Sequence, residues 1–294
     1  MKLAVNTEHR IGVVEGDQFY DVTDAVPGAG PAWPPMYMNR LIAEWAELGP
    51  KVAAARKAAS PVALSSMKLL PPNPCPVHVI AAPANYRKHI GEIGARSVSK
   101  GRTAEQQGFF MKSTASLVGA GGAIELPRGS TRRFDHESEL AVIIGRRARN
   151  VPRAEAMDYV FGYSCLMDIT MRIEPGVAEE ERVTRKSFET FTPLGPWIVT
   201  ADEVVDPHAL RNQLWVNGVS KQDANTRDMI VNIPALIELI SSVMTLNPGD
   251  VIASGTPEGV GPIVPGDSIR IGIESVGEMT LPVVEAAQFS PRRF

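Results

Sequence analysis

The feature that most restricts the fold of this chain is a series of short apolar segments separated by glycine and proline. The sequence contains 25 glycines and 24 prolines, and these residues stand beside nearly every apolar segment after residue 76. Short apolar runs bounded in this way are typical of β-strands. We expect strands at residues 77–82, 139–144, 197–199, 213–216, 250–254, 268–273 and 279–284.

One segment of this part of the chain has a clear helical pattern. Pro234 occupies a first-turn position, and the tripeptide at 247–249 (Asn-Pro-Gly) ends the helix. Between them, apolar residues recur at helical spacing, namely Leu236, Ile237, Ile240, Val243 and Met244. The main part of the chain is therefore expected to be a β-rich structure of the α+β class with few helices.

The first 70 residues have a different organisation. Apolar segments at 3–5, 11–14 and 19–22 alternate with polar turns and predict a small antiparallel meander, and residues 36–59 have helical periodicity. Prolines at 71, 72, 74 and 76 then indicate a linker. We expect a small N-terminal α/β domain at residues 1–70 and a main domain at 71–294.

Charge and composition exclude several classes of protein. The 30 basic and 33 acidic residues give a net charge of −3, which favours neither nucleic acid nor an anionic membrane as partner. No segment approaches the ~20 apolar residues of a membrane helix, and the start lacks the apolar core of a secretion signal. Cys75 and Cys165 have no metal-binding spacing. A cytoplasmic protein is expected.

An acidic pair provides the strongest chemical signal. Glu137 and Glu139 stand at the start of an apolar strand and, being two apart, project from the same face. Two carboxylates this close repel unless a cation or a proton lies between them. Asp168 ends a second apolar segment at 159–167 and would add a third oxygen ligand. Three carboxylates suit one Mg²⁺ or Mn²⁺ ion, although an exposed strand edge with two ordinary glutamates fits the spacing as well.

A possible acid–base pair precedes these residues in the sequence. His89 and Glu92 are three apart, which makes them neighbours on one helical turn. A carboxylate beside an imidazole fixes the tautomer and raises the basicity, as a general base requires. A surface ion pair remains the alternative. Residues 93–108, which follow, are polar and without periodicity, and we expect a mobile surface loop there.

Two further motifs have weaker signals. Lys186 lies in a mixed polar and aromatic segment, where a solvated lysine is the ordinary expectation. The loop at 255–261 follows a predicted strand and could offer backbone N–H groups to an anion. Neither this loop nor the glycines at 119–122 have the strand-to-helix context of a nucleotide site.

Taken in order, these motifs resemble those of the fumarylacetoacetate hydrolase family, and in particular its bacterial acylpyruvate hydrolases. The resemblance covers roughly residues 77–284 and lies in the segments NYRKHIGE, FFMKSTASLVG, DHESELAVIIG, FGYSCLMDITMR, RKSFETFTPLGPWIVT, VNGVSKQDANTRDM and TLNPGDVIASGTPEGVG. It implies a mixed β-sandwich roll for residues 71–294, a homodimer, and one divalent ion. By match to the family motifs, the ligands of that ion would be Glu137, Glu139 and Asp168.

The resemblance also implies roles for other residues. Lys186 would act in catalysis with His89 and Glu92, the last two on a mobile lid. Contacts to the substrate would come from Thr256, Gly255, Lys112 and Arg172. The chain departs from the common pattern at Met167 for asparagine, Glu189 for aspartate, and Pro83-Ala84 for Gly-Leu, which leaves the metal ligands intact and puts the pocket shape and the substrate in question.

The implied reaction is hydrolysis of a carbon–carbon bond in an acylpyruvate, a small 2-oxo acid. The His89 and Glu92 pair would activate water, while the metal and Lys186 would stabilise the pyruvate enolate. Decarboxylation, hydration or isomerisation of a related 2-oxo acid would use the same metal site. A non-catalytic metal-binding β-domain is a further alternative, but it leaves His89, Glu92 and Lys186 without a purpose.

Overall fold

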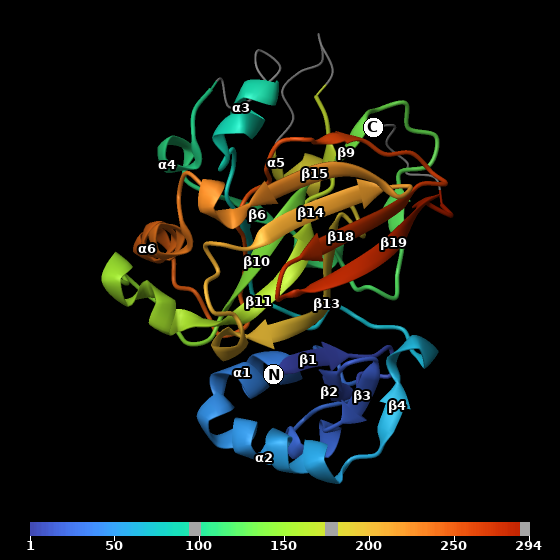
Figure 1. Ribbon diagram of the computed structural model, residues 1–294, viewed down its shortest axis with the longest axis vertical. Coiled ribbons are helices and arrows are strands. Elements are labelled where there is room, and N and C mark those ends of the chain that lie inside the picture. The colour runs from blue at the N-terminus through green and yellow to red at the C-terminus, as the bar shows by residue number, and fades with distance from the viewer. Residues whose placement is uncertain (94–100, 174–181, 289–294) are drawn as a thin grey trace.

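The computed structural model describes residues 1–93, 101–173 and 182–288. The fold is the expected β-rich α+β type, with a small lobe at the bottom of Figure 1 and a larger body above it. The lobe consists of β1 (Lys2–Val5), β2 (Ile11–Glu15), β3 (Gln18–Asp21), α1 (Tyr37–Ala43), α2 (Trp45–Ala58) and β4 (Pro61–Ala63). The antiparallel pairing of β1 with β2 and of β2 with β3 confirms the predicted meander.

A long mixed sheet joins the lobe to the body. Strand β1 pairs antiparallel with β13, Leu3 lying opposite Ile198, and within the described residues the sheet has the order β4-β3-β2-β1-β13-β11-β10-β16-β5-β6. Its strands in the body are β5 (Val79–Ala81), β6 (Phe110–Lys112), β7 (Leu117–Val118, beside β13), β10 (Ser138–Ile144), β11 (Val160–Met167), β13 (Thr192–Thr200) and β16 (Val251–Ala253). Backbone hydrogen bonding thus continues across the expected boundary, and a division into domains at residue 70 stays a prediction.

A second sheet packs against the body of the long sheet. It has the order β15-β14-β18-β19-β8, with β8 (Ile124–Leu126), β14 (Arg211–Val216), β15 (Val219–Asn225), β18 (Ser268–Ile273) and β19 (Gly277–Glu285). Leu140 and Val142 of the first sheet share one buried apolar cluster with Leu214, Ile271 and Leu281 of the second. This sheet-on-sheet packing, visible in Figure 1, is the sandwich that the sequence resemblance implied.

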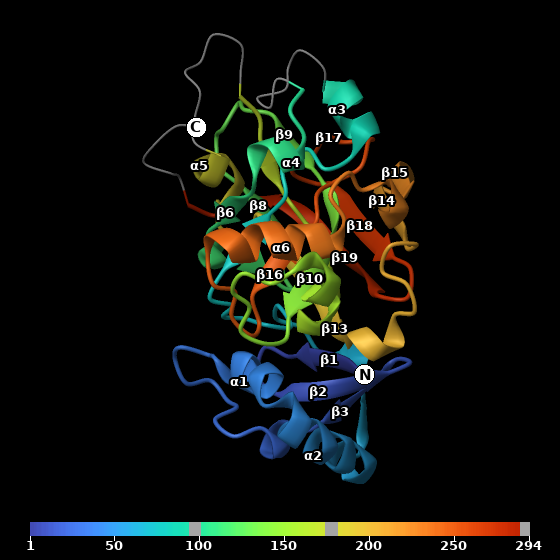
Figure 2. The same cartoon turned by 90° about the vertical axis from the view of Figure 1, so that its left-hand side faces the viewer.

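The remaining elements surround one end of the sandwich. A short sheet of β9 (Phe134–His136), β12 (Thr170–Met171) and β17 (Gly261–Pro262) lies there, together with α3 (Arg87–Ile93), α4 (Ala104–Gln107) and α5 (Arg182–Lys186). The helix expected after Pro234 is α6 (Ile233–Val243), which Figure 2 shows in front of β10 and β16. No helix in the described ranges is long and apolar enough to cross a membrane.

Two expectations from the sequence need comment. Residues 104–107, expected to belong to an irregular loop, form α4, because Thr103 and Gln106 make a reciprocal capping box at its start; residues 94–100 of the expected loop lie outside the described residues. Strand β13 is much longer than the predicted segment at 197–199. Its prolines and its glycine, read from the sequence as boundaries, lie inside the strand.

Candidate active site

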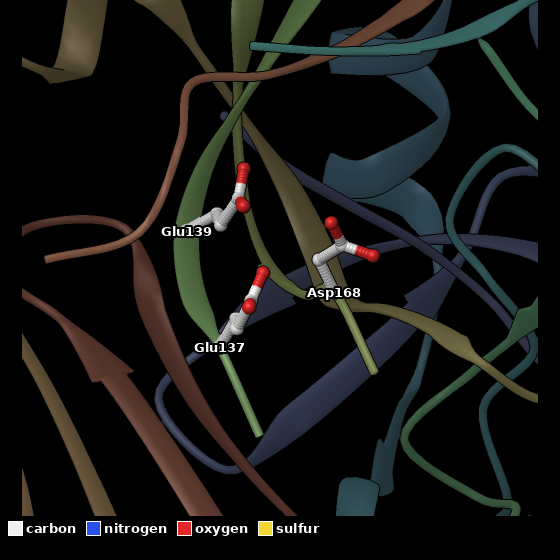
Figure 3. Close-up of side chains that lie close together, drawn as sticks. All are labelled: Glu137, Glu139 and Asp168. Carbon is white, nitrogen blue, oxygen red and sulfur yellow. The ribbon is translucent and has the colours of Figure 1, made fainter. Parts of the chain in front are cut away.

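Three carboxylates meet where β10 begins and its neighbour β11 ends. Glu137 is the single residue between β9 and β10. Glu139 follows two residues later on the same face, as strand alternation requires. Asp168 comes directly after β11, the neighbour of β10, and its backbone N–H donates to the Glu137 carbonyl at 2.9 Å. One carboxylate oxygen from each side chain lies within 4.8 Å of the others. Figure 3 shows the three side chains close together, Glu137 and Glu139 from one segment and Asp168 beside them.

Buried cations surround this carboxylate cluster. Lys186 Nζ donates to Glu137 Oε2 at 3.0 Å, to Asp168 Oδ2 at 2.5 Å and to Thr170 Oγ1 at 2.7 Å. Lys112 Nζ donates to the other oxygen of Asp168 and, at 3.1 Å, to a backbone carbonyl. Arg172 Nη2 donates to Glu137 Oε1 at 2.6 Å. The structure therefore brings Lys186, Lys112 and Arg172 to the predicted ligands, as the sequence resemblance implied.

The two glutamates differ in their electrostatic surroundings. Burial raises the pKa of Glu139 well above its ordinary value, and the nearby charges of Asp168 and Glu137 raise it further. Burial acts on Glu137 in the same direction, but the positive charges of Lys186 and Arg172 outweigh it and lower the pKa of this glutamate. Glu139 accepts a hydrogen bond from the Gly255 backbone N–H at 2.7 Å. Without a further cation these surroundings favour the protonated form of Glu139, and a divalent ion would take the place of that proton.

The donor atoms fit a hard divalent cation. All three residues are at most 4% exposed, and each offers an oxygen within 4.8 Å of the other two. Mg²⁺ and Mn²⁺ prefer oxygen ligands and retain positions for water or substrate when three come from the protein. The chemistry and burial of this carboxylate cluster are thus suited to one Mg²⁺ or Mn²⁺ ion.

The predicted acid–base pair lies beside the carboxylate cluster. His89, on α3, is 5% exposed, and its Nδ1 lies 3.5 Å from Glu92 Oε2. Burial lowers the pKa of His89, while the charge of Glu137 partly opposes this effect. Glu92 also accepts from the Gly259 backbone N–H at 3.1 Å, which ties α3 to the loop after β16. The helical neighbourhood of His89 and Glu92 agrees with their spacing in the sequence; their catalytic roles stay a prediction.

The loop after β16 closes another side of the site. Gly255 has φ +95°, and a Cβ at this position would lie 2.6 Å from the Cβ of Asn85, so a side chain does not fit there. This close approach lets the Gly255 N–H reach Glu139. Thr256, the next residue, is 4% exposed. Of the two predicted substrate contacts on this loop, Gly255 thus donates directly to a predicted metal ligand, and Thr256 follows it in the chain.

Gln222 on β15 is a site residue that reasoning from the sequence missed. Its Nε2 donates to Thr256 Oγ1 at 2.9 Å and to the Pro257 carbonyl at 3.0 Å. Its Oε1 accepts from the Ser138 backbone N–H at 2.9 Å, and Ser138 lies between the two ligand glutamates. Gln222, which lies on the second sheet, thus connects the strand that carries Glu139 (the ligand strand) to the loop after β16 that carries Thr256 (the substrate loop). Nothing in its local sequence distinguishes it from an exposed glutamine.

Comparisons with known proteins show which family the chain resembles. A family model described as fumarylacetoacetate (FAA) hydrolase C-terminal matches residues 78–284. A protein named maleylpyruvate hydrolase from Aquipseudomonas alcaligenes is 42% identical over 291 residues, which cover 96% of this chain and 99% of the relative. This identity extends through the N-terminal lobe as well as the body.

Solved structures show the same relationship. The crystal structure of a maleylpyruvate hydrolase from Sphingobium sp. SYK-6 in complex with manganese(II) and pyruvate has a TM-score of 0.86, with 44% identity over 97% of this chain and 100% of that one. A fumarylacetoacetate hydrolase from Exiguobacterium antarcticum has a TM-score of 0.79 at 31% identity, again covering 97% and 100% of the two chains. The sequence, the fold and the buried carboxylate cluster agree, and the chain belongs to the fumarylacetoacetate hydrolase family.

Proposed function

We propose that this protein is a Mg²⁺- or Mn²⁺-dependent hydrolase of acylpyruvates, which it cleaves into pyruvate and a carboxylic acid. The observation that carries the proposal is the placement of the His89 and Glu92 pair beside the carboxylate cluster of Glu137, Glu139 and Asp168. The full-length relatives named maleylpyruvate hydrolase support the same reaction class.

The reaction needs a base that is neutral at working pH. Burial lowers the pKa of His89, so its imidazole is unprotonated near neutrality and can accept a proton from water. The water oxygen then forms a bond to the C4 carbonyl carbon of the substrate. Glu92, 3.5 Å from Nδ1, stabilises the imidazolium that results.

Cleavage of the C3–C4 bond moves an electron pair toward the C2 oxygen of the pyruvate fragment. A divalent ion, when bound, supplies a Lewis acid for the oxygens at this end of the substrate. Lys186 and Lys112 lie beside Asp168 with ammonium groups that can donate to an oxygen carrying this charge. Proton transfer to C3 then completes pyruvate, and the acyl fragment leaves as a carboxylate.

A product analysis tests the proposal. The purified protein is incubated with Mn²⁺ and separately with maleylpyruvate, acetylpyruvate and oxaloacetate, and the products are identified by mass. We expect pyruvate plus a carboxylic acid from at least one acylpyruvate, and loss of this activity in excess EDTA. If oxaloacetate yields pyruvate and CO₂ and no acylpyruvate is cleaved, the protein is a decarboxylase and the hydrolase proposal is wrong.

Assembly and location complete the proposal. We propose a homodimer, because exposed strand edges are commonly covered in assemblies and because the family resemblance implies it. Light scattering at micromolar concentration measures this directly, and a monomeric mass would contradict it. A cytoplasmic location fits a catabolic enzyme of this type, and fractionation of the source cells would test it.

A further inference from the structure

A further buried acid precedes the two ligand glutamates. Asp135, on β9, is 2% exposed and lies two residues before Glu137. Among the residues that the structure describes, the carboxylates able to share one ion are those of Glu137, Glu139 and Asp168, and Asp135 is not one of them. A buried carboxylate needs compensating partners, so the contacts of Asp135 show what this acid does beside the site.

Two arginines hold the Asp135 carboxylate. Arg133 donates from Nε to Oδ1 at 2.7 Å and from Nη2 to Oδ2 at 3.1 Å. Arg172 donates from Nε to Oδ2 at 2.7 Å, and its Nη2 donates to Glu137 Oε1 at 2.6 Å. One planar guanidinium, that of Arg172, thus joins Asp135 to a proposed metal ligand, and its fork of N–H groups suits two carboxylates at once.

Backbone pairing fixes the relative position of Asp135 and Arg172. Strand β9 pairs antiparallel with β12, where Asp135 lies opposite Thr170. The ladder continues beyond β12, because the Arg172 backbone N–H donates to the Arg133 carbonyl at 2.8 Å. The backbone therefore places Arg172 alongside Asp135, and the hydrogen bond from Nε then fixes the direction of the guanidinium.

The guanidinium in turn restricts Glu137. The two oxygens of this glutamate have different donors, Arg172 at Oε1 and Lys186 at Oε2. Lys186 Nζ also donates to Asp168 Oδ2, so Oε2 is the Glu137 oxygen on the side of Asp168, and Arg172 holds the other one. Partners that hold a ligand side chain in this way typically raise metal affinity ~10- to 100-fold.

We propose that Asp135 is a positioning residue, which holds the Arg172 guanidinium against Glu137 and so orients this ligand for a divalent ion. This inference rests on the proposed function for the metal site and is independent of the reaction. It requires that Asp135 and Arg172 both increase Mn²⁺ affinity, although their charges are opposite.

The opposite charges separate positioning from simple electrostatics. If charge alone acted, removing the negative Asp135 would weaken Mn²⁺ binding and removing the positive Arg172 would strengthen it. Mn²⁺ affinity is measured by calorimetry for the unaltered protein, Asp135→Asn, Arg172→Gln, Arg172→Lys and the double variant Asp135→Asn/Arg172→Gln. Arg133→Gln is the matched control, because it removes an arginine from the same carboxylate and leaves the link to Glu137 in place.

We expect each single change at Asp135 or Arg172 to weaken Mn²⁺ binding ~10- to 100-fold. Arg172→Lys is included in this expectation, because it keeps the charge and loses the planar fork. The double variant should bind no more weakly than the weaker single variant, since both changes break one link. The EPR spectrum of bound Mn²⁺ should change in these variants and stay that of the parent in Arg133→Gln.

Three results would overturn the proposal: tighter Mn²⁺ binding in Arg172→Gln, parental affinity in Arg172→Lys, or losses that add in the double variant. Chemical denaturation of the metal-free proteins shows which variants fold. Should Asp135→Asn not fold, the two Arg172 variants still decide, because the proposal requires both to weaken Mn²⁺ binding.

The same proteins separate this inference from the proposed function. If acylpyruvates are cleaved while the variants bind Mn²⁺ as tightly as the parent, the assignment of Asp135 is wrong and the hydrolase proposal stands. If the variants lose Mn²⁺ affinity as expected and no acylpyruvate is cleaved, the assignment stands and the reaction class is wrong. If the unaltered protein binds no Mn²⁺, both are wrong.

Discussion

Ion pairs differ in burial between the N-terminal lobe and the active site in the body. In the N-terminal lobe, ion pairs such as Arg10 with Asp21 lie at the surface, with side chains 41% and 35% exposed. In the active site of the body, Lys112 pairs with Asp168 with side chains 0% and 1% exposed. Removing charges from water costs several kcal/mol per ion, whereas a surface pair contributes ~0–1 kcal/mol. We therefore infer that the buried charges serve the chemistry of the site, since their burial lowers the stability of the fold.

The largest expected contrast comes from removing one acid from each of these two regions. Asp168→Ala removes one of the three proposed ligands, so we expect Mn²⁺ affinity to fall at least ~10²-fold and hydrolysis to disappear. Asp21→Ala removes a partner of Arg10 and should leave both unchanged. Calorimetric titration with Mn²⁺ and a pyruvate assay measure the two effects. Normal metal affinity in Asp168→Ala would show that the ion binds elsewhere.

A second contrast uses one histidine from each region. His89→Ala should lower hydrolysis ~10²- to 10⁴-fold, because it removes the proposed base, while oxalate affinity in Mn²⁺ stays within about twofold. His9, in the lobe, contacts the Tyr37 hydroxyl through Nδ1 at 2.8 Å, and His9→Asn should have no kinetic effect. Full activity in His89→Ala, or loss of oxalate binding with it, would contradict the separation of base and metal anchor.

The pH dependence of metal binding should differ from that of lobe stability. Because the pKa of Glu139 is raised by burial and by Asp168 and Glu137, a proton occupies this carboxylate below that pKa and must leave when the metal binds. Mn²⁺ affinity should then fall by up to ~10-fold for each pH unit below it. Calorimetry in buffers of different ionisation enthalpy should detect about one proton released.

The pKa of Asp21 is shifted in the opposite direction from that of Glu139. Burial opposes the effect, but hydrogen bonds from Arg10 and Thr23 lower its pKa, so its contribution to stability is present above the unfolded-state pKa and is lost as the pH falls through the folded-state value. Protonation of Asp21 thus opposes folding, whereas protonation of Glu139 competes with binding of the metal ion. Mn²⁺ binding without proton release would remove this distinction.

A smaller effect is expected at Gln222, which has no ligand role of its own. Gln222→Leu removes the donor to Thr256 and leaves the Ser138 N–H without its acceptor. We expect kcat to fall ~10-fold, because the substrate loop loses its position relative to the ligand strand, with Mn²⁺ affinity nearly unchanged. Gln222→Glu keeps an acceptor for Ser138 but places a buried carboxylate oxygen against the Pro257 carbonyl, so it should be at least as impaired. A variant indistinguishable from the parent would make Gln222 a packing residue.

Gln222 also shows which parts of the site the sequence could predict. Glu137, Glu139 and Asp168 could be predicted from the sequence because strand alternation and an apolar run ending in aspartate are local patterns. The neighbourhood of His89 and Glu92 follows from helical spacing in the same way. The family resemblance, rather than any pattern, pointed to Lys112 and Arg172, which reach the site from other elements.

The rest depends on contacts between distant segments. Gln222 meets Ser138, 84 residues earlier, through packing of the two sheets, and such packing leaves no mark in either local sequence. The pairing of β1 with β13 joins residues 2–3 to residues 198–199 for the same reason. Helix α4 was missed because its single turn is held by a capping box, which a polar segment without periodicity does not reveal.

The smallest expected effect on catalysis lies at the junction between the two regions. Asn73 is fully buried; its Nδ2 donates to Asn39 Oδ1 at 2.6 Å and to the Gly249 carbonyl at 2.9 Å. It therefore links α1 of the lobe to the turn before β16. Gly249 has φ +87°, and a Cβ there would lie 2.5 Å from Asn39 Oδ1 and 2.6 Å from Asn73 Nδ2, so both asparagine side chains pack closely against the Gly249 backbone.

Asn73→Ala should leave the Asn39 oxygen and the Gly249 carbonyl without this donor, and so lower the free energy of unfolding by about 1–3 kcal/mol. Because neither partner touches the carboxylate cluster, KM, kcat and Mn²⁺ affinity should stay within about twofold of the parent. Chemical denaturation measures the free energy of unfolding and the pyruvate assay measures KM and kcat. Gln18→Ala on β3 is a control that is expected to change neither. If Asn73→Ala impairs catalysis as strongly as Gln222→Leu, the lobe and the active site are coupled through the long sheet. The expectation that the lobe affects stability and not catalysis is then wrong.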